Sequence, residues 1–129
     1  MYNHQFVVHT TYHSGTEFIS HPWSYRSNLC PDHPHINQLA GIYSTSSGYA
    51  NLEYGPGCTG MYPINGSSKD TNYGVMGSIS WSMEISYQKQ PPTSQIVYYW
   101  NLNLPAMLTM MEYCNYGPVS YTHLRAHET

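Results

Sequence analysis

The chain of 129 residues has the length of one domain, and only 9% of it is charged, against about 25% in typical globular proteins. Its net charge of −3 with four basic residues excludes a cationic surface for nucleic acid or an anionic membrane, and no apolar run approaches the ~20 residues of a membrane span. The fourteen tyrosines and the low charge indicate one of two things: a fragment whose surface is normally covered by additional protein, or a secreted, tyrosine-rich protein.

The first predicted element is a buried strand. β-Branched and aromatic residues dominate positions 5–12, and this run ends at His13. A second short apolar stretch over 17–23 stops at Pro22. A histidine where a strand opens into a loop is either a partly buried side chain with a satisfied hydrogen bond or a metal ligand. The local sequence leaves both interpretations open.

A helix and a long loop follow. Apolar residues at helical spacing predict a helix over 33–47, with Asp32 as its N-cap and Gly48 as its terminator. Residues 50–77 are rich in Gly, Asn and Ser and are predicted to form one long loop. Such a loop exceeds the ~12–15 residues common in compact domains and is usually functional or disordered.

Strict alternation over residues 77–88 predicts a second strand, with Ile, Trp and Met on one face and serines with Glu84 on the other. Two interpretations of Glu84 stay open. Either the serine face is solvated and Glu84 is simply wet, or Glu84 lies at the mouth of a semi-apolar cleft. In a cleft, partial desolvation raises the pKa of a carboxylate and suits it to act as a general base.

The last predicted helix covers 94–114, and Pro105 inside it predicts a kink or a break. Strand, helix, long loop, strand and helix in this order favour an α/β fold. Among the three cysteines, Cys30 and Cys58 stand in loop-like sequence and could pair in an oxidising compartment. Cys114 lies in the helical pattern and is predicted to be a small buried hydrophobe.

The segment 118–129 continues none of these patterns and looks like translated adaptor DNA, so we exclude it from the domain, which we assign to residues 1–117. The sequence HLRAH places His123 and His127 at a zinc-binding spacing. Leu124 stands where the glutamate of the zincin motif belongs, so we do not predict a metal site there.

Three segments in order, YHSGTEFISHPW, YPINGSSKD and SWSMEIS, together resemble the zinc metallocarboxypeptidase family, the carboxypeptidase A-like exopeptidases. In that family a strand ends in His-Ser, a Pro-aromatic pair follows, and a helix comes next. A Tyr-x-x-x-Gly-x-x-x-Asp loop and a strand with the catalytic glutamate complete the pattern. The matching positions here are His13, Pro22-Trp23, Tyr62, Gly66, Asp70 and Glu84.

The resemblance implies a mixed-sheet α/β zinc-carboxypeptidase fold with helices packed on the sheet, and a hydrolase that acts on the C-termini of peptides or proteins. By this resemblance His13 is a zinc ligand, Glu84 is the general base and Tyr62 closes over the C-terminal residue. Ser14 would line the substrate subsites through its backbone. Lys69 would favour an acidic terminal residue, and a solvated loop lysine is the alternative. Thr71 departs from the tryptophan common at its position.

The largest departure is upstream. The family takes its other two zinc ligands from a His-x-x-Glu motif, and residues 1–117 contain none. The arginines that bind the substrate carboxylate also lie upstream in the family. We therefore expect the C-terminal portion of a catalytic domain, with the N-terminal half of the same domain as its missing partner. Such a piece should be inactive by itself and bind zinc poorly, since one histidine cannot hold the metal.

The resemblance also implies a secreted or periplasmic location, although the N-terminus has no signal-peptide pattern. The alternative function is a non-catalytic relative, a peptide- or cell-wall-binding module that uses the same cleft without metal. The presence of both His13 and Glu84 favours the enzyme. Opposite placement of these two residues across the sheet would overturn the resemblance.

Overall fold

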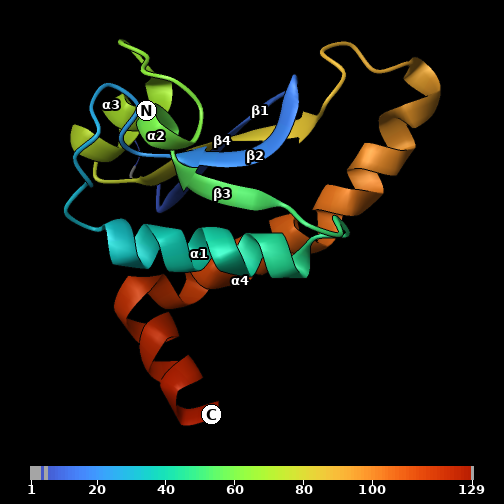
Figure 1. Cartoon of the computed structure of the whole chain (residues 1–129). Coiled ribbons are helices and arrows are strands. Elements are labelled where there is room, and N and C mark those ends of the chain that lie inside the picture. The colour runs from blue at the N-terminus through green and yellow to red at the C-terminus, as the bar shows by residue number, and fades with distance from the viewer. Residues whose placement is uncertain (1–3, 5, 129) are drawn as a thin grey trace.

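The structure, a computed structural model, describes residues 4 and 6–128, with side chains described up to residue 115. Its elements follow one another along the chain as a mixture of short strands and helices (Figure 1). They are β1 (Val8–His13), β2 (Thr16–His21), α1 (His33–Ser46), β3 (Glu53–Pro56), α2 (Gly57–Gly60), α3 (Ser68–Gly74), β4 (Ile79–Ser86), the 3₁₀ helix η1 (Thr93–Gln95) and α4 (Ile96–Glu128).

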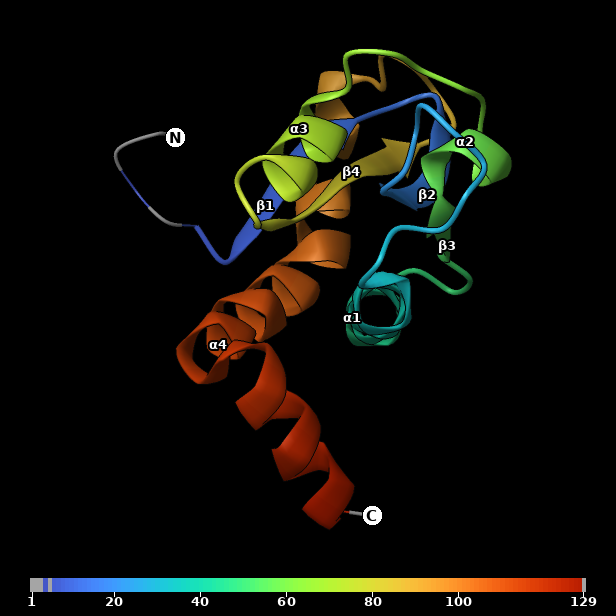
Figure 2. The ribbon, with the colours of Figure 1, turned by 90° about the vertical axis from the view of Figure 1, so that its left-hand side faces the viewer.

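The strands form one mixed sheet in the order β1-β4-β2-β3. β1 runs parallel to β4, β2 runs parallel to β3, and β2 and β4 are antiparallel. Helices α1 and α4 lie against one face of the sheet, and α3 lies on the opposite face (Figure 2). The α/β prediction and its mixed sheet with packed helices are therefore confirmed.

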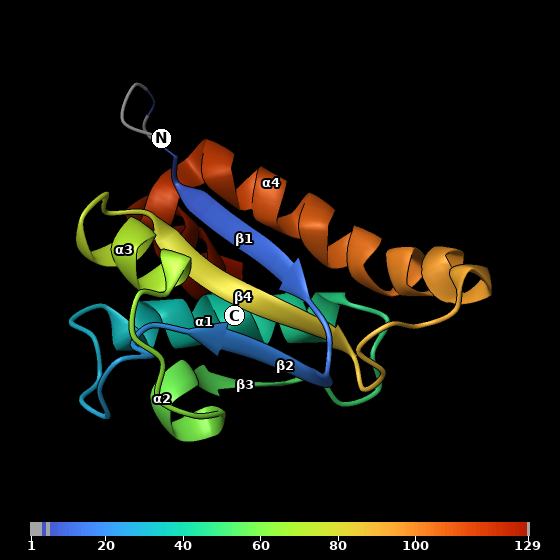
Figure 3. The same cartoon turned by 90° about the horizontal axis from the view of Figure 1, so that it is seen from above.

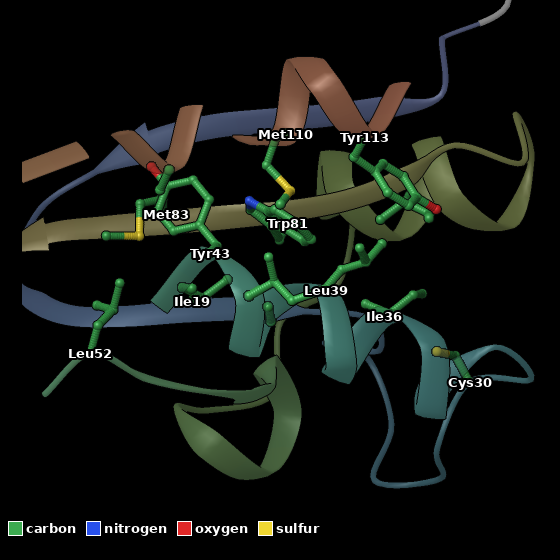
Figure 4. Close-up of a cluster of buried hydrophobic side chains, with 14 residues drawn as sticks. Ile19, Cys30, Ile36, Leu39, Tyr43, Leu52, Trp81, Met83, Met110 and Tyr113 are labelled. Carbon is green, nitrogen blue, oxygen red and sulfur yellow. The ribbon is translucent and has the colours of Figure 1, made fainter. Parts of the chain in front are cut away.

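The apolar core fills the space between the sheet and helices α1 and α4 (Figure 4). Alternation along β4 directs Trp81 and Met83 to this face, and both side chains are fully buried. They meet Leu39 and Tyr43 of α1, and Met110 of α4 comes from the other side. Each large apolar side chain removed from water here stabilises the fold by about 1.5–3 kcal/mol.

Tyrosine hydroxyls and one asparagine join α1, α4 and the sheet inside this core. The Tyr43 hydroxyl donates to Oδ1 of Asn103 at 2.8 Å. The Nδ2 group of Asn103 in turn donates to the Tyr49 hydroxyl at 3.0 Å and to the Tyr99 carbonyl at 2.9 Å. Tyr49 donates to the Ile85 carbonyl at 2.7 Å. Tyr43 and Tyr49 thus pack their rings in or against the core while their hydroxyls are hydrogen bonded.

The prediction of one long loop over 50–77 is wrong, because the segment contains β3, α2 and α3. None of the three has a hydrophobic period of its own, and each is stabilised by tertiary contacts. β3 pairs with β2 in the register Phe18↔Glu53 to His21↔Pro56. A seven-residue helix such as α3 is too short to be stable in isolation.

The two predicted ends of α1 are only partly correct. Asp32 stands at the N-cap, but its carboxylate accepts a hydrogen bond from the Tyr73 hydroxyl at 2.7 Å instead of capping the helix. Gly48 lies past the extended Ser47, and its N–H donates to the Leu102 carbonyl at 2.8 Å. A Cβ at Gly48 would stand 2.9 Å from Cδ2 of Leu102, so this glycine serves the close approach of α4.

Pro105 predicted a kink or a break, and the break does not occur: helix α4 is continuous through Pro105, and its backbone continues to Glu128. Cys30 and Cys58, whose pairing the sequence left open, are free. The prediction that Cys114 is buried is wrong, because its side chain is exposed. The assignment of 118–129 as a tail outside the domain stays a prediction. The side chains of His123 and His127 lie outside the described residues.

One edge and one helix face of the described structure are uncovered. β1 is an edge strand, and its outer side pairs with no strand of the described part of the chain. On α4 the side chains of Ile96, Val97, Trp100, Leu108 and Met111 are each more than half exposed. That more protein covers this surface stays a prediction. No helix within the described residues is both long and apolar enough to cross a membrane.

We expect Asn103→Leu to lower the free energy of unfolding by about 1–3 kcal/mol, because Tyr43 and Tyr49 lose buried hydrogen-bond partners. The matched control is Asn101→Leu, at an exposed position of the same helix, with an expected effect within about 0.5 kcal/mol. Urea denaturation of both variants measures the difference. Equal stabilities would show that this network does not stabilise the packing of α4.

Candidate functional site

The site is built at the ends of two parallel neighbouring strands, β1 and β4. Their register pairs Val8 with Ile79 and proceeds without interruption to His13 and Glu84. Residues paired in this way point to the same face of a sheet. On this face, two residues before His13 and Glu84 in each strand, the Thr11 hydroxyl donates to the Ser82 hydroxyl at 3.1 Å. His13 and Glu84 are therefore adjacent, as the resemblance requires.

Glu84 is partly buried and lies on the sheet face opposite α1 and α4. The interpretation of Glu84 as a fully solvated side chain is therefore wrong. Burial raises the pKa of its carboxyl above the ordinary value of 4.5. Electrostatic interactions with His13 and Lys69 act in the opposite direction. The imidazole of His13 is exposed, and its Nε2 lies 3.1 Å from Oγ1 of Thr11.

Lys69 is buried, at 3% exposure, so the alternative interpretation of it as a solvated loop lysine is wrong. It stands in the first turn of α3, and burial lowers the pKa of its ammonium while the negative charges of Asp70 and Glu84 oppose this. Its stem fits against Gly57: a Cβ at that position would lie 3.3 Å from Cε of Lys69 and 2.6 Å from Oγ of Ser20. A bare backbone at 57 therefore makes room for the lysine.

Asp70 holds the segment that follows β2 in place beside the site. Its carboxylate accepts the backbone N–H of Ser24 at 2.8 Å and that of Tyr25 at 3.2 Å. Charge-assisted bonds of this kind are about twice as strong as neutral ones. The Ser24 carbonyl in turn accepts the N–H of Ile64 at 2.9 Å, which ties the Tyr62 loop to the same segment.

Tyr62 borders an open cavity of about 380 Å³ over the end of β4. Its ring is 59% exposed, and its backbone N–H donates to the Gly57 carbonyl at 3.1 Å. The cavity walls come from the β1–β2 turn, the segment after α2 and the end of β4. The lining residues are Ser14, Gly15, Thr16, Gly60, Met61, Tyr62, Glu84 and Lys89.

The structure thus brings His13, Ser14, Tyr62 and Glu84 together, with Lys69 buried beside Glu84. Ser14 contributes a side chain as well as backbone, since its hydroxyl donates to the Lys89 carbonyl at 2.5 Å. Sequence reasoning missed Lys89. The only signal for it was rarity, since the chain has just four basic residues.

The zinc implied by the resemblance needs three protein ligands, with a fourth position for water. Within the described ranges no three His, Cys, Asp or Glu side chains come close enough to hold a metal ion. His13 offers one exposed imidazole, and Glu84 stands beside it. The described residues therefore do not form a complete zinc site, and the role of His13 as a zinc ligand stays a prediction.

Comparison with known proteins agrees with this geometry. The family model for zinc carboxypeptidases matches residues 1–106, and the chain belongs to that family. The chain is also 31% identical, over 118 residues, to Carboxypeptidase SOL1 of Arabidopsis thaliana. This match covers 83% of the chain and 24% of the relative, so the chain spans about a quarter of that protein's length.

We expect Lys69→Met to raise the pKa of Glu84 further, because one of the two electrostatic interactions that lower it is removed. A group whose pKa is raised by folding contributes stability fully below its unfolded value of 4.5, and this is lost as the pH rises through the folded pKa. The variant should extend that loss to higher pH. Carbon-13 NMR titration of the carboxyl groups measures the shift. Glu17, whose pKa is raised by burial alone, is the internal control.

Proposed function

We propose that this chain contributes the general base, one metal ligand and the substrate-covering segment to a zinc metallocarboxypeptidase that releases C-terminal residues from peptides. The observation that supports this is the pairing of His13 with Glu84 at the ends of adjacent parallel strands, under a cavity bordered by Tyr62. The remaining ligands and the substrate-carboxylate clamp would come from protein outside the described residues.

Zinc, when bound, would lower the pKa of a coordinated water and polarise the scissile carbonyl. Glu84 would accept the proton of the attacking water and later deliver it to the leaving amine. Burial suits Glu84 to this task, since a carboxylate with a raised pKa is a stronger base. The nearby charge of Lys69 opposes that rise.

The substrate would be a peptide or protein C-terminus with an acidic last residue. Tyr62 stands at the mouth of the cavity, where its exposed ring can close over the bound residue. Ser14 borders the same cavity. Lys69 supplies a buried positive charge, and the neighbouring Ser24 hydroxyl is buried with no hydrogen-bond partner in the described structure. A carboxylate side chain would satisfy both groups.

The second candidate is a non-catalytic peptide- or cell-wall-binding module. It would use the same cavity without metal. It predicts peptide binding that does not depend on zinc and no release of amino acids. A secreted or periplasmic location belongs to either proposal.

We expect Glu84→Gln to reduce kcat by about 10²–10⁴-fold in the complete, zinc-loaded gene product, because the proton acceptor is lost. The matched control is Glu17→Gln, on the sheet face that carries Tyr49, with an expected change below twofold. Release of the terminal amino acid from a peptide measures both. Unchanged activity in Glu84→Gln, or no zinc-dependent release in any variant, would contradict the enzymatic function.

We expect a preference for terminal Glu over terminal Gln that Lys69→Met reduces by about 10-fold or more, because an acidic side chain loses its buried partner. The ratio of kcat/KM for the two peptides measures this and cancels any effect of the altered Glu84 pKa on the chemical step. Equal values of kcat/KM for the two peptides in the wild type would show that Lys69 does not bind the terminal side chain.

A further inference from the structure

Lys89 lines the cavity from the side of the β1–β2 turn. This turn and the end of β4 lie side by side (Figure 3). Two hydrogen bonds join them: the Gly15 N–H donates to the Ser86 carbonyl at 2.7 Å, and the Ser14 hydroxyl donates to the Lys89 carbonyl at 2.5 Å. The backbone of Lys89 is therefore fixed relative to Ser14 and to the strand that bears Glu84.

The Lys89 side chain lies along the bare backbone of Gly15. The position of a Cβ on Gly15 would be 3.6 Å from Cγ and 3.9 Å from Cε of the lysine. The φ angle of Gly15 is +130°, a value that L residues with a side chain rarely adopt. At Gly15, this wall of the cavity therefore consists of backbone and the aliphatic part of the Lys89 side chain.

The distribution of positive charge around Glu84 is uneven. Only four residues of the chain are basic, and two of them, Lys69 and Lys89, border Glu84 or its cavity. Lys69 is buried beside the charges of Asp70 and Glu84. Lys89 is exposed and forms no ion pair with any residue that the structure describes. Arg26 is elsewhere occupied, 5.5 Å from the Trp23 ring and 5.1 Å from that of Tyr25.

We propose that Lys89 is a specificity-determining residue that binds an acidic side chain on the amino-terminal side of the scissile bond. The proposal rests on the function proposed above, in which the terminal residue is directed to Lys69. In that arrangement the peptide that precedes the scissile bond would extend from Glu84 along Ser14, Gly15 and Lys89, which line the cavity. An unpaired ammonium there selects a carboxylate over a neutral amide of the same shape.

The test uses two peptides with the same terminal glutamate that differ only in the residue before it, Glu in one and Gln in the other. In the complete gene product the ratio of kcat/KM should favour the Glu peptide by about 2- to 5-fold, as for an exposed ion pair. Lys89→Gln should abolish the preference and Lys89→Glu should reverse it. Raising the salt concentration should weaken it.

Arg26→Gln is the matched control, since it removes one positive charge away from the cavity lining and should keep the preference. Affinities of the same peptides for Glu84→Gln, with and without Lys89→Gln, give a second measurement that needs no cleavage. If no peptide is cleaved, the enzymatic function fails while the affinity ratio still judges Lys89. Equal affinities for the two peptides, or a preference that survives Lys89→Gln, would overturn the inference.

Discussion

The parallel pairing of β1 with β4 is the constraint on which the rest of the site depends. Because side chains alternate along a strand, a slip of one residue would send His13 to the core face and leave Glu84 without its neighbour. The apolar side chains of β4 anchor the register, since Trp81 and Met83 can be buried only against α1 and α4. Core packing on one face thus positions polar chemistry on the other.

The polar face is not a solvated surface, and this explains its electrostatics. Ser80 is fully buried and its hydroxyl lies 3.0 Å from Nδ1 of His9, while α3 covers the same face with Lys69. Burial there favours a neutral carboxyl at Glu84, whereas electrostatic interactions with His13 and Lys69 favour its ionised form. Burial is the larger of these opposing effects, so the pKa of Glu84 is raised.

Sequence periodicity predicted β1, β4, α1 and the first part of α4, because apolar residues recur along these elements at strand or helix spacing. It marked residues 17–23 only as an apolar stretch and did not identify β2 as a strand. It failed over residues 50–77, where β3, α2 and α3 are too short for a period and are held by neighbours. A glycine is needed at position 48 because α4 approaches the backbone closely there. Cys114 lies on an exposed part of the same helix. These outcomes depend on residues far away in the chain, which local patterns do not contain.

The sequence by itself determined the types of chemical group and their order: a histidine closing one strand, then a tyrosine and an aspartate, and a glutamate on another strand. Their spacing sufficed to indicate the family. Only the tertiary structure decided that Lys69 is buried beside Glu84 and that Lys89 lines the cavity with Ser14. The physical reason is that burial and electrostatic coupling arise between segments that only folding brings together.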